Sequence, residues 1–310
     1  MKLSDICKHI NKECKSDIEI KNLATLKEAK KDSLSFFHNS KYINDLKTTK
    51  AGAVILKEED APLLPKEAVA IISQNPYEDM AKVTSLFKYT PSEKTYNPTL
   101  KEGARVANSA NFGKNVVIGK NSLIMAGCYI GDNVEIGDNT IIYPNVVIYH
   151  NCKIGNNCTI HSGTIIGSDG FGFAQTIKFY QIGNVVVEDN VEIGANCTID
   201  RAALGSTTIK KGAKLDNLIQ IGHNCEIGEY SIIVSQVGLS GSTILGKGVI
   251  MGGQSATAGH LKIGDRAIIA ARGGVTKSLE GDKTYGGFPA VEIRLWRKMQ
   301  AALMRLVKRK

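Results

Sequence analysis

The sequence lacks several features that would place it in common functional classes. It has no apolar run long enough to span a membrane, and its first residues lack the apolar core of a signal peptide, so we expect a cytoplasmic protein. Its seven cysteines include no Cys-x-x-Cys pair, which argues against a zinc site or a disulfide framework. Aromatic residues make up only 6% of the 310 residues, and no series of them interleaves with the basic residues, which disfavours a nucleic-acid partner.

The sequence does contain a six-residue period that runs through its second half. An aliphatic or aromatic residue recurs at every sixth position over 106–166, again over 187–199, and without a break over 209–275, where only Thr257 is polar. Neither a helix nor a flat strand has this period, whereas a parallel β-helix built from hexapeptides does. The sequence therefore predicts a mainly β protein whose second half is a triangular prism of stacked coils.

The other positions of the hexad support this prediction. Gly often follows the apolar residue (Gly119, Gly131, Gly137, Gly155, Gly167, Gly194, Gly222, Gly228, Gly246, Gly264), and Asn often stands two positions further on (Asn121, Asn133, Asn139, Asn151, Asn157, Asn196, Asn224). Both residues tolerate positive φ, so each hexad should contain a short strand and a corner. With coils ~4.8 Å apart, the repeats predict about eight or nine coils and a prism ~40 Å long.

The cysteines follow the same repeat. Five of the seven occupy the fifth position of the hexad, which takes small side chains near the prism interior (Cys128, Cys152, Cys158, Cys197, Cys225). We therefore predict that all seven cysteines are small, reduced residues rather than metal ligands or disulfide partners.

The chain divides into three parts. Residues 1–100 show no hexad; they mix helical stretches at 3–10 and 76–87 with strand-like runs at 53–56 and 69–72, which predicts a small α/β domain. A linker at 91–98 leads to the prism, predicted over 101–290 and ending in Gly286-Gly287-Phe288-Pro289-Ala290. The interruption that begins at Ser168 and lasts to Val186 should leave the prism as a loop that builds a binding wall.

The last part, 291–310, is predicted to be a basic amphipathic helix. It carries seven basic side chains against one acidic residue, Glu292, and apolar residues recur in it at helical spacing. Its basic face is either simply solvated or docks an acidic protein partner.

Histidine positions within the repeat give the first indication of chemistry. His223 stands two positions after Ile221, at a corner, so its side chain should point outward. Gly241 occupies the same place on the next coil, ~5 Å away, and His260 follows two coils along, at ~10 Å. An imidazole is a base near neutral pH, and a Gly N–H can face a developing oxyanion. Spacing alone leaves open whether Gly241 and His260 merely form corners.

Several stretches resemble a known family. The run Leu215-Asp216-Asn217-Leu218-Ile219-Gln220-Ile221-Gly222-His223-Asn224 resembles the active-site coil of the lipid A acyltransferases, whose β-helices are left-handed. Five more stretches resemble the UDP-3-O-acylglucosamine N-acyltransferases within that family: 161–172, 198–201, 259–260, 34–42 and 51–55. The last two lie in the predicted α/β domain and resemble the uridine-binding domain of these enzymes.

The resemblance implies roles for individual residues. His223 would be the general base, Gly241 the backbone oxyanion donor and His260 a supporting residue. Phe36, Asn39 and Tyr42 would hold the uracil, with Phe37 as an alternative to Phe36. Asp216 matches an acidic residue near the catalytic histidine, but its spacing puts it on the neighbouring face. Small residues such as Gly273 and Gly274 would line a groove for the acyl chain.

The resemblance also implies a reaction and partners. A 3-hydroxyacyl chain would pass from acyl carrier protein, a small acidic protein, to the 2-amine of UDP-3-O-acylglucosamine, giving UDP-2,3-diacylglucosamine. The amine is the nucleophile, so the enzyme needs no cofactor beyond the phosphopantetheine of the carrier and no metal. The basic terminal helix would dock the carrier. The family suggests a homotrimer.

Other functions remain open on the sequence. The main alternative is a hexapeptide-repeat acyltransferase that uses acyl-coenzyme A and another sugar nucleotide. A zinc enzyme resembling γ-class carbonic anhydrase would need three converging imidazoles, and the closely spaced His pair typical of such sites is missing. A structural solenoid without catalysis would explain neither the uridine-like domain nor the loop.

Overall fold

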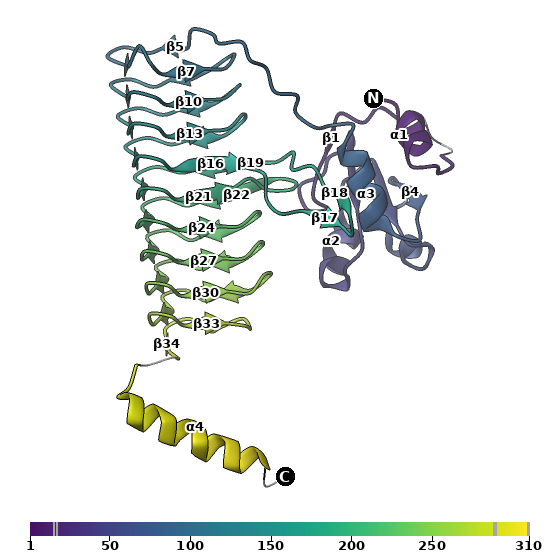
Figure 1. Cartoon of the computed structure of the whole chain (residues 1–310). Coiled ribbons are helices and arrows are strands. Elements are labelled where there is room, and N and C mark those ends of the chain that lie inside the picture. The colour runs from purple at the N-terminus through teal and green to yellow at the C-terminus, as the bar shows by residue number, and fades with distance from the viewer. Residues whose placement is uncertain (15, 17, 288–289, 309–310) are drawn as a thin grey trace.

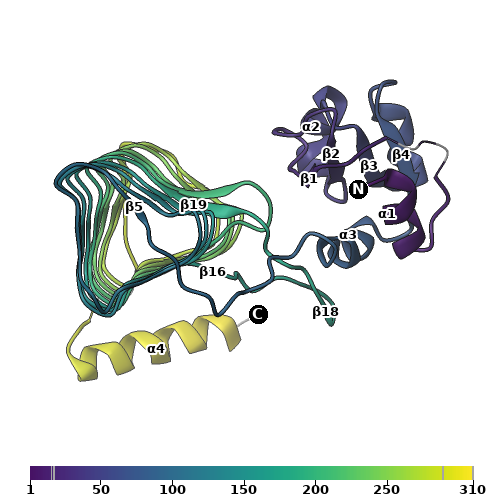
Figure 2. The same ribbon diagram turned by 90° about the horizontal axis from the view of Figure 1, so that it is seen from above.

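The computed structural model describes residues 1–14, 16, 18–287 and 290–308. It contains a small α/β domain, a left-handed parallel β-helix and a C-terminal helix (Figure 1). Seen along its axis, the β-helix is a triangular prism, and the α/β domain lies to one side of it (Figure 2).

Three parallel sheets of nine, nine and ten strands form the faces of the prism, and we name them A, B and C. Face A contains β7 (Asn111–Phe112), β10 (Tyr129–Ile130), β13 (Val147–Ile148), β16 (Ile165–Ser168), β21 (Thr198–Asp200), β24 (Gln220–Ile221), β27 (Gly238–Leu239), β30 (Ala256–Thr257) and β33 (Gly274–Val275). Face B contains β5 (Thr99–Leu100), β8 (Val117–Ile118), β11 (Glu135–Ile136), β14 (Lys153–Ile154), β19 (Asn184–Val187), β22 (Ser206–Ile209), β25 (Glu226–Ile227), β28 (Ile244–Leu245) and β31 (Lys262–Ile263). Face C contains β6 (Arg105–Val106), β9 (Leu123–Ile124), β12 (Ile141–Ile142), β15 (Thr159–Ile160), β20 (Glu192–Ile193), β23 (Lys214–Leu215), β26 (Ile232–Ile233), β29 (Ile250–Met251), β32 (Ile268–Ile269) and β34 (Thr284–Tyr285).

The hexad explains this architecture directly. The residues of the six-residue series point inward and form one continuous core, which confirms the predicted fold. The polar exception, Thr257, is buried and pairs its hydroxyl with that of Thr243 at 3.1 Å. The short strands β5 and β34 extend the prism at its two ends, so it has slightly more coils than predicted and begins two residues before 101. All seven cysteines are free, and five of them lie in the core of the prism.

The corners rest on asparagine more than on glycine. All seven corner asparagines predicted to have positive φ do so, with values between 54° and 61°. Of the ten glycines that follow the apolar residue, however, only Gly167 has a positive φ, of 89°. The others are glycine because neighbouring coils leave no room: a β-carbon on Gly137 would lie 2.6 Å from the carbonyl carbon of Gly155.

The N-terminal domain is built on a four-stranded parallel sheet in the order β1-β2-β3-β4. Its strands are β1 (Asn22–Leu23), β2 (Ser33–Phe36), β3 (Ala53–Leu56) and β4 (Val69–Ile72), and its helices are α1 (Leu3–His9), η1 (Ser40–Tyr42), α2 (Ile43–Thr48), η2 (Glu58–Leu63) and α3 (Pro76–Thr84). The predicted strands at 53–56 and 69–72 are correct. The two predicted helices are also present but end earlier than expected.

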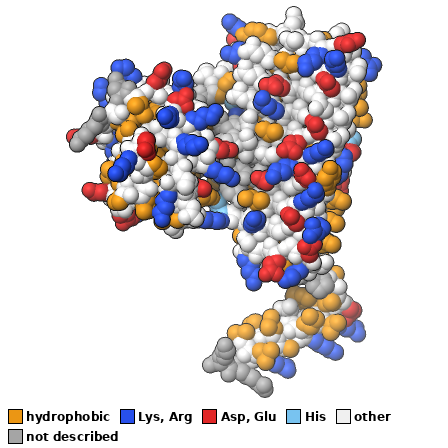
Figure 3. Space-filling model, turned by 180° about the vertical axis from the view of Figure 1, so that it is seen from behind, with side chains coloured by type: hydrophobic (Ala, Val, Ile, Leu, Met, Phe, Trp, Pro, Cys, Tyr) orange, Lys and Arg blue, Asp and Glu red, His pale blue; other side chains and the backbone are white. Residues whose placement is uncertain are grey.

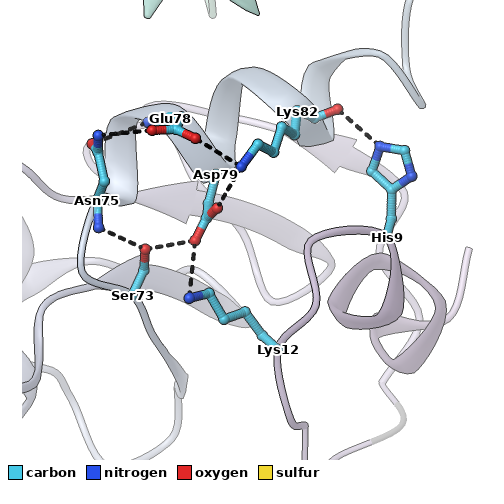
Figure 4. A network of polar contacts seen from close by, with 7 residues as sticks. All are labelled: His9, Lys12, Ser73, Asn75, Glu78, Asp79 and Lys82. Carbon is cyan, nitrogen blue, oxygen red and sulfur yellow. Dashed lines mark hydrogen bonds and ion pairs between the residues drawn. The ribbon is translucent and has the colours of Figure 1, made fainter.

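A polar network holds α3 in place (Figure 4). Asp79 is buried on α3, accepts the Ser73 hydroxyl at 2.6 Å, and forms ion pairs with Lys12 at 3.4 Å and Lys82 at 3.6 Å. A buried carboxylate is tolerated because it is paired and hydrogen-bonded. Through Lys12 the network ties α3 to the segment that follows α1, and through Ser73 it ties α3 to the segment that follows β4.

The loop that leaves the prism is the main bridge between the two domains. It contains the antiparallel pair β17 (Phe173–Ala174) and β18 (Ile177–Lys178), which reaches α3 (Figure 1). Phe179 and Leu204 are part of the N-terminal domain's hydrophobic core. Leu204 belongs to a second, shorter excursion at 201–205 that the hexad analysis missed. The two domains thus share a core.

The C-terminal helix α4 (Ile293–Lys308) lies beyond the prism (Figure 1). Phe288 and Pro289, at the predicted end of the prism, and Arg309 and Lys310, at the end of the predicted helix, lie outside the described residues. No described helix combines the length and apolar character that a membrane crossing requires.

Candidate active site

The corner after β24 places His223 on the outside of the prism, as predicted. The imidazole is half-buried between two glycines. A β-carbon on Gly241, in the next coil, would lie 2.6 Å from its Nε2, and one on Gly170, in the loop, would lie 2.7 Å from its Cβ. Only glycine at both positions leaves room for the ring.

The backbone amide of Gly241 is unbonded among the described residues, as are those of Asp132 and His150 at the same position of earlier coils, and it lies against the His223 ring. At six other corners, the N–H two positions after the apolar residue donates to an Asp or Asn side chain of a neighbouring coil (Lys114, Lys120, Asp138, Asn156, Ala195, Lys247). The residue facing Gly241 in this way is Gly259, which has no side chain. No acceptor among the described residues reaches the Gly241 N–H. The amide is free to bind a ligand oxygen.

A carboxylate that the sequence reasoning did not single out lies next to this corner. Asp200, one coil earlier on face A, accepts the Ser168 hydroxyl at 3.2 Å and the Gln220 side-chain amide at 3.1 Å. The pKa of Asp200 is raised, because the effect of burial exceeds the opposing effect of those two hydrogen bonds and of the nearby His223. In the sequence, the stretch 198–201 stands out only by its resemblance to the family. The repeat alone does not show which outward-facing residue is buried by its neighbours.

Positively charged and titratable groups meet where the N-terminal domain reaches the prism. Lys41 donates from Nζ to the carbonyl oxygen of His260 at 2.9 Å. Burial lowers the pKa of His260, and Lys41 and His223 lower it further. Burial also lowers the pKa of His38, with a further contribution from His260. We call His38, Lys41 and His260 the seam; the Lys41 ammonium there favours an anionic ligand, and the two neutral imidazoles can hydrogen-bond to it.

The three residues predicted to hold uracil lie together at the end of β2 and in η1. Tyr42 is 37% exposed, and Asn39 is exposed and caps η1 with its side chain. Phe36 is half-buried and stacks on His38, with ring centroids 5.2 Å apart. Phe37 is only 4% exposed, so the alternative that its ring faces a ligand is wrong. Side chains alternate along a strand, and Phe37 points into the core.

Phe36 also belongs to an aromatic cluster that spans the two domains. Phe36, His38, Tyr77 and Phe179 make ring contacts with centroids 5.0 to 6.1 Å apart. Sequence reasoning missed this cluster because Phe179 comes from the excursion, about a hundred residues away along the chain from Tyr77. The cluster fixes the predicted uracil site relative to the loop beside His223.

Asp216 lies on face C, as its spacing indicated. One carboxylate oxygen accepts the backbone N–H of Asn217 at 2.8 Å, and the other accepts that of Ser235 at 3.1 Å. The Asp216 side chain therefore stabilises its own corner and the corner of the next coil, within this chain.

A second histidine corner lies on the other side of the loop. Arg201 is fully buried, donates from Nε to the Gly167 carbonyl at 2.7 Å, and places Nη1 2.6 Å from His150 Nε2. A guanidinium can only donate, so His150 Nε2 is the acceptor and the ring is neutral. Tyr89 stacks on this ring at 3.6 Å. Burial and the charge of Arg201 lower the pKa of His150 to about 4.

A cavity of about 450 Å³ opens over this second corner. Tyr89, Tyr129, His150 and Tyr180 line it, and so does Asp169, the residue before the glycine that packs on His223. The loop therefore separates this cavity from the His223 corner. Within the described ranges, no group of three His, Cys, Asp or Glu side chains could hold a metal ion.

Comparisons with known proteins match parts of both domains. Residues 17–86 match the family model of UDP-3-O-(3-hydroxymyristoyl) glucosamine N-acyltransferase, and 109–137 and 133–168 match bacterial transferase hexapeptide repeats. A solved UDP-N-acetylglucosamine O-acyltransferase from Moraxella catarrhalis is similar in fold, with a TM-score of 0.50 and 24% identity over 65% of this chain and 76% of that one.

Two relatives that match this chain over nearly its full length establish its family. The UDP-3-O-acylglucosamine N-acyltransferase of Wolinella succinogenes is 48% identical over 100% of this chain and 99% of that protein. UDP-3-O-acylglucosamine N-acyltransferase 1 of Sulfurimonas denitrificans is 50% identical over 99% of both chains. Identity of this extent covers the α/β domain, the prism and the terminal helix together, and the chain therefore belongs to the UDP-3-O-acylglucosamine N-acyltransferase family.

Proposed function

We propose that this chain transfers a 3-hydroxyacyl group from acyl carrier protein to the 2-amine of UDP-3-O-acylglucosamine, giving UDP-2,3-diacylglucosamine for lipid A. The observation that carries the proposal is the corner at which the His223 imidazole lies against the unbonded amide of Gly241. A base and an oxyanion donor within one corner are what aminolysis of a thioester requires.

In the proposed reaction, His223 Nε2 removes a proton from the amine as its nitrogen attacks the thioester carbonyl. A C–N bond forms, and the negative charge on the carbonyl oxygen is held by the Gly241 N–H. As the C–S bond breaks, the imidazolium returns the proton to the departing thiolate of phosphopantetheine. One preorganised oxyanion donor typically contributes about 3–4 kcal/mol. We propose no metal and no cofactor beyond the phosphopantetheine of the donor.

The nucleotide would bind between the two domains. Tyr42, Phe36 and Asn39 would hold the uracil, and the seam, including His260 as the supporting residue, suits the charge of a diphosphate. The acyl chain would run along face A toward the end of the prism, where Gly273 and Gly274, by the strand three beyond β24, help to line a cavity of about 190 Å³.

Two exposed surfaces fit the partners. Along α4, apolar side chains such as Trp296 (48% exposed) lie beside basic ones (Figure 3), which suits an acidic carrier protein. On face C, Ile141, Ile232 and Ile268 are 36%, 46% and 38% exposed, which suits burial against other copies in a homotrimer. We place the enzyme in the cytoplasm, where its free thiols would stay reduced.

Mass spectrometry of the product is the decisive test. The purified protein is given 3-hydroxyacyl chains on acyl carrier protein or on coenzyme A, each with UDP-3-O-acylglucosamine or UDP-N-acetylglucosamine. We expect a diacylated product from the carrier-bound donor and the 3-O-acylated sugar only. Equal or faster transfer from coenzyme A, or to another sugar nucleotide, would support the alternative acyltransferase instead.

A further inference from the structure

The residue after the base makes an unusual set of contacts. Asn224 lies at a corner with φ of 60°, and its backbone N–H donates to the Thr207 hydroxyl at 2.8 Å. Its side chain reaches the short excursion at 201–205, where it meets the backbone of Ala203 and Leu204. The same side-chain oxygen lies 3.1 Å from Nδ1 of His223.

These backbone partners leave one orientation for the Asn224 amide. The Ala203 N–H can only donate, so the atom 3.0 Å from it is the side-chain oxygen. The Leu204 carbonyl can only accept, so the atom 2.8 Å from it is the NH₂ group. Asn224 therefore presents an acceptor, not a donor, to the imidazole.

An acceptor at 3.1 Å requires that His223 Nδ1 carry a hydrogen. In a neutral ring the other nitrogen, Nε2, is then bare, and Nε2 is the atom that lies against Gly241. We infer that Asn224 is a positioning residue that holds the proton of His223 on Nδ1 and keeps Nε2 free as the base. This role rests on the proposed function, because an unprotonated Nε2 matters only if it receives the proton of an attacking amine.

Aspartate and alanine at this position separate the possible roles of Asn224. N224D keeps the acceptor, gives up the amide that donates to the Leu204 carbonyl and adds a negative charge. The ring then faces Asp200 and this new carboxylate, and the nearby His260, whose pKa is lowered, offsets them little. The imidazolium is stabilised, so the acid limb of the profile of kcat/KM against pH should move to higher pH. N224A removes the acceptor, and kcat should fall by ~10- to 100-fold, part of what a positioned base contributes.

N133A is the matched control for the cost of alanine at this corner. Asn133 has φ of 55° at the equivalent position of an earlier coil and follows Asp132, not a histidine. We expect N133A and N224A to lower the melting temperature similarly, but only N224A to lower kcat. N224D should recover most of the turnover at a pH above the new limb.

The direct measurement is the ¹⁵N NMR spectrum of wild-type protein labelled at histidine, with the His223 signals identified by their loss in H223Q. We expect a protonated, pyrrole-type Nδ1 and a bare, pyridine-type Nε2 at a pH where the ring is neutral. A bare Nδ1, or an N224A protein with wild-type kcat and pH profile, would overturn the proposal. An inactive wild-type protein with the expected spectrum would instead reject the proposed function.

Discussion

Two corners of the prism have the same sequence pattern, but their histidines lie in different surroundings. Both read His-Asn-Cys-x-Ile-Gly, at 150–155 and at 223–228, and both follow a strand of face A. His150 is 9% exposed, bonded to Arg201 and stacked under Tyr89. His223 is half-buried and faces a free amide.

The neighbours of each corner, not the repeat itself, decide what the histidine does. Asn151 accepts from Asn133 at 3.0 Å, within the row of corner asparagines, whereas Asn224 turns to the excursion and the imidazole. Arg201 and Tyr89 close one corner, while Gly241 and Gly170 leave room around the other ring. Identical hexads therefore place a histidine in two different environments, and of the two rings it is His223 that lies beside an unbonded backbone amide.

The largest expected effect separates the two histidines by chemistry. His223→Ala should lower kcat by ~10³-fold or more, because it removes the base, while leaving the far-ultraviolet circular dichroism unchanged. H150Q should keep turnover of the wild-type order at pH 7.5, because glutamine can still accept from Arg201. The measurement is steady-state acyl transfer by both variants. Near-normal turnover of H223A would reject His223 as the base.

The next effect distinguishes His150 from His223 by its contribution to the free energy of unfolding. The pKa of His150 is lowered to about 4, so the folded chain resists a proton that the unfolded chain accepts below the ordinary value of 6.5. Stability from this group is therefore complete above pH 6.5 and is lost as the pH falls toward 4, by up to ~3 kcal/mol.

Urea unfolding between pH 7 and pH 4.5 measures this loss. H150Q should flatten the dependence of the unfolding free energy on pH, and H161Q, at a less buried histidine of the same prism, should not. Parallel curves for wild type and H150Q would contradict the assignment of a buried, neutral His150.

The repeat made the prism predictable and the site only partly so. The period placed His223, Gly241 and His260 on one side of the molecule, because coil spacing converts sequence distance into height. It could not reveal Asp200 or Asn224, since their roles come from contacts across excursions that break the period. Nor could it separate His150 from His223, because identical hexads differ only in what packs on them.

A substitution at Gly259 can make the corner of the proposed active site resemble the six at which an Asp or Asn side chain accepts the backbone amide. In G259N, the side-chain oxygen should accept the Gly241 N–H, as Asp265 accepts that of Lys247 at 3.0 Å. Withdrawing the oxyanion donor should lower kcat by ~10- to 100-fold with little change in KM. G259A is the control: its β-carbon, 3.2 Å from the Gly241 carbonyl oxygen, tests crowding alone. Equal loss in both variants would mean that the free amide is not what matters.

The smallest effect should lie outside both corners and touch binding rather than chemistry. Tyr42→Ala should raise the KM for the nucleotide sugar by about 2- to 10-fold, the value of one aromatic contact, with kcat nearly unchanged. Phe36→Ala should raise it too, but Phe36 also packs on His38 and Phe179, so its effect mixes binding with domain docking. Tyr96→Ala, at a 42% exposed linker tyrosine, is the control for Tyr42. If KM were unchanged in both variants, the uracil would have to bind elsewhere, and the division of labour between a binding domain and a catalytic corner would not hold.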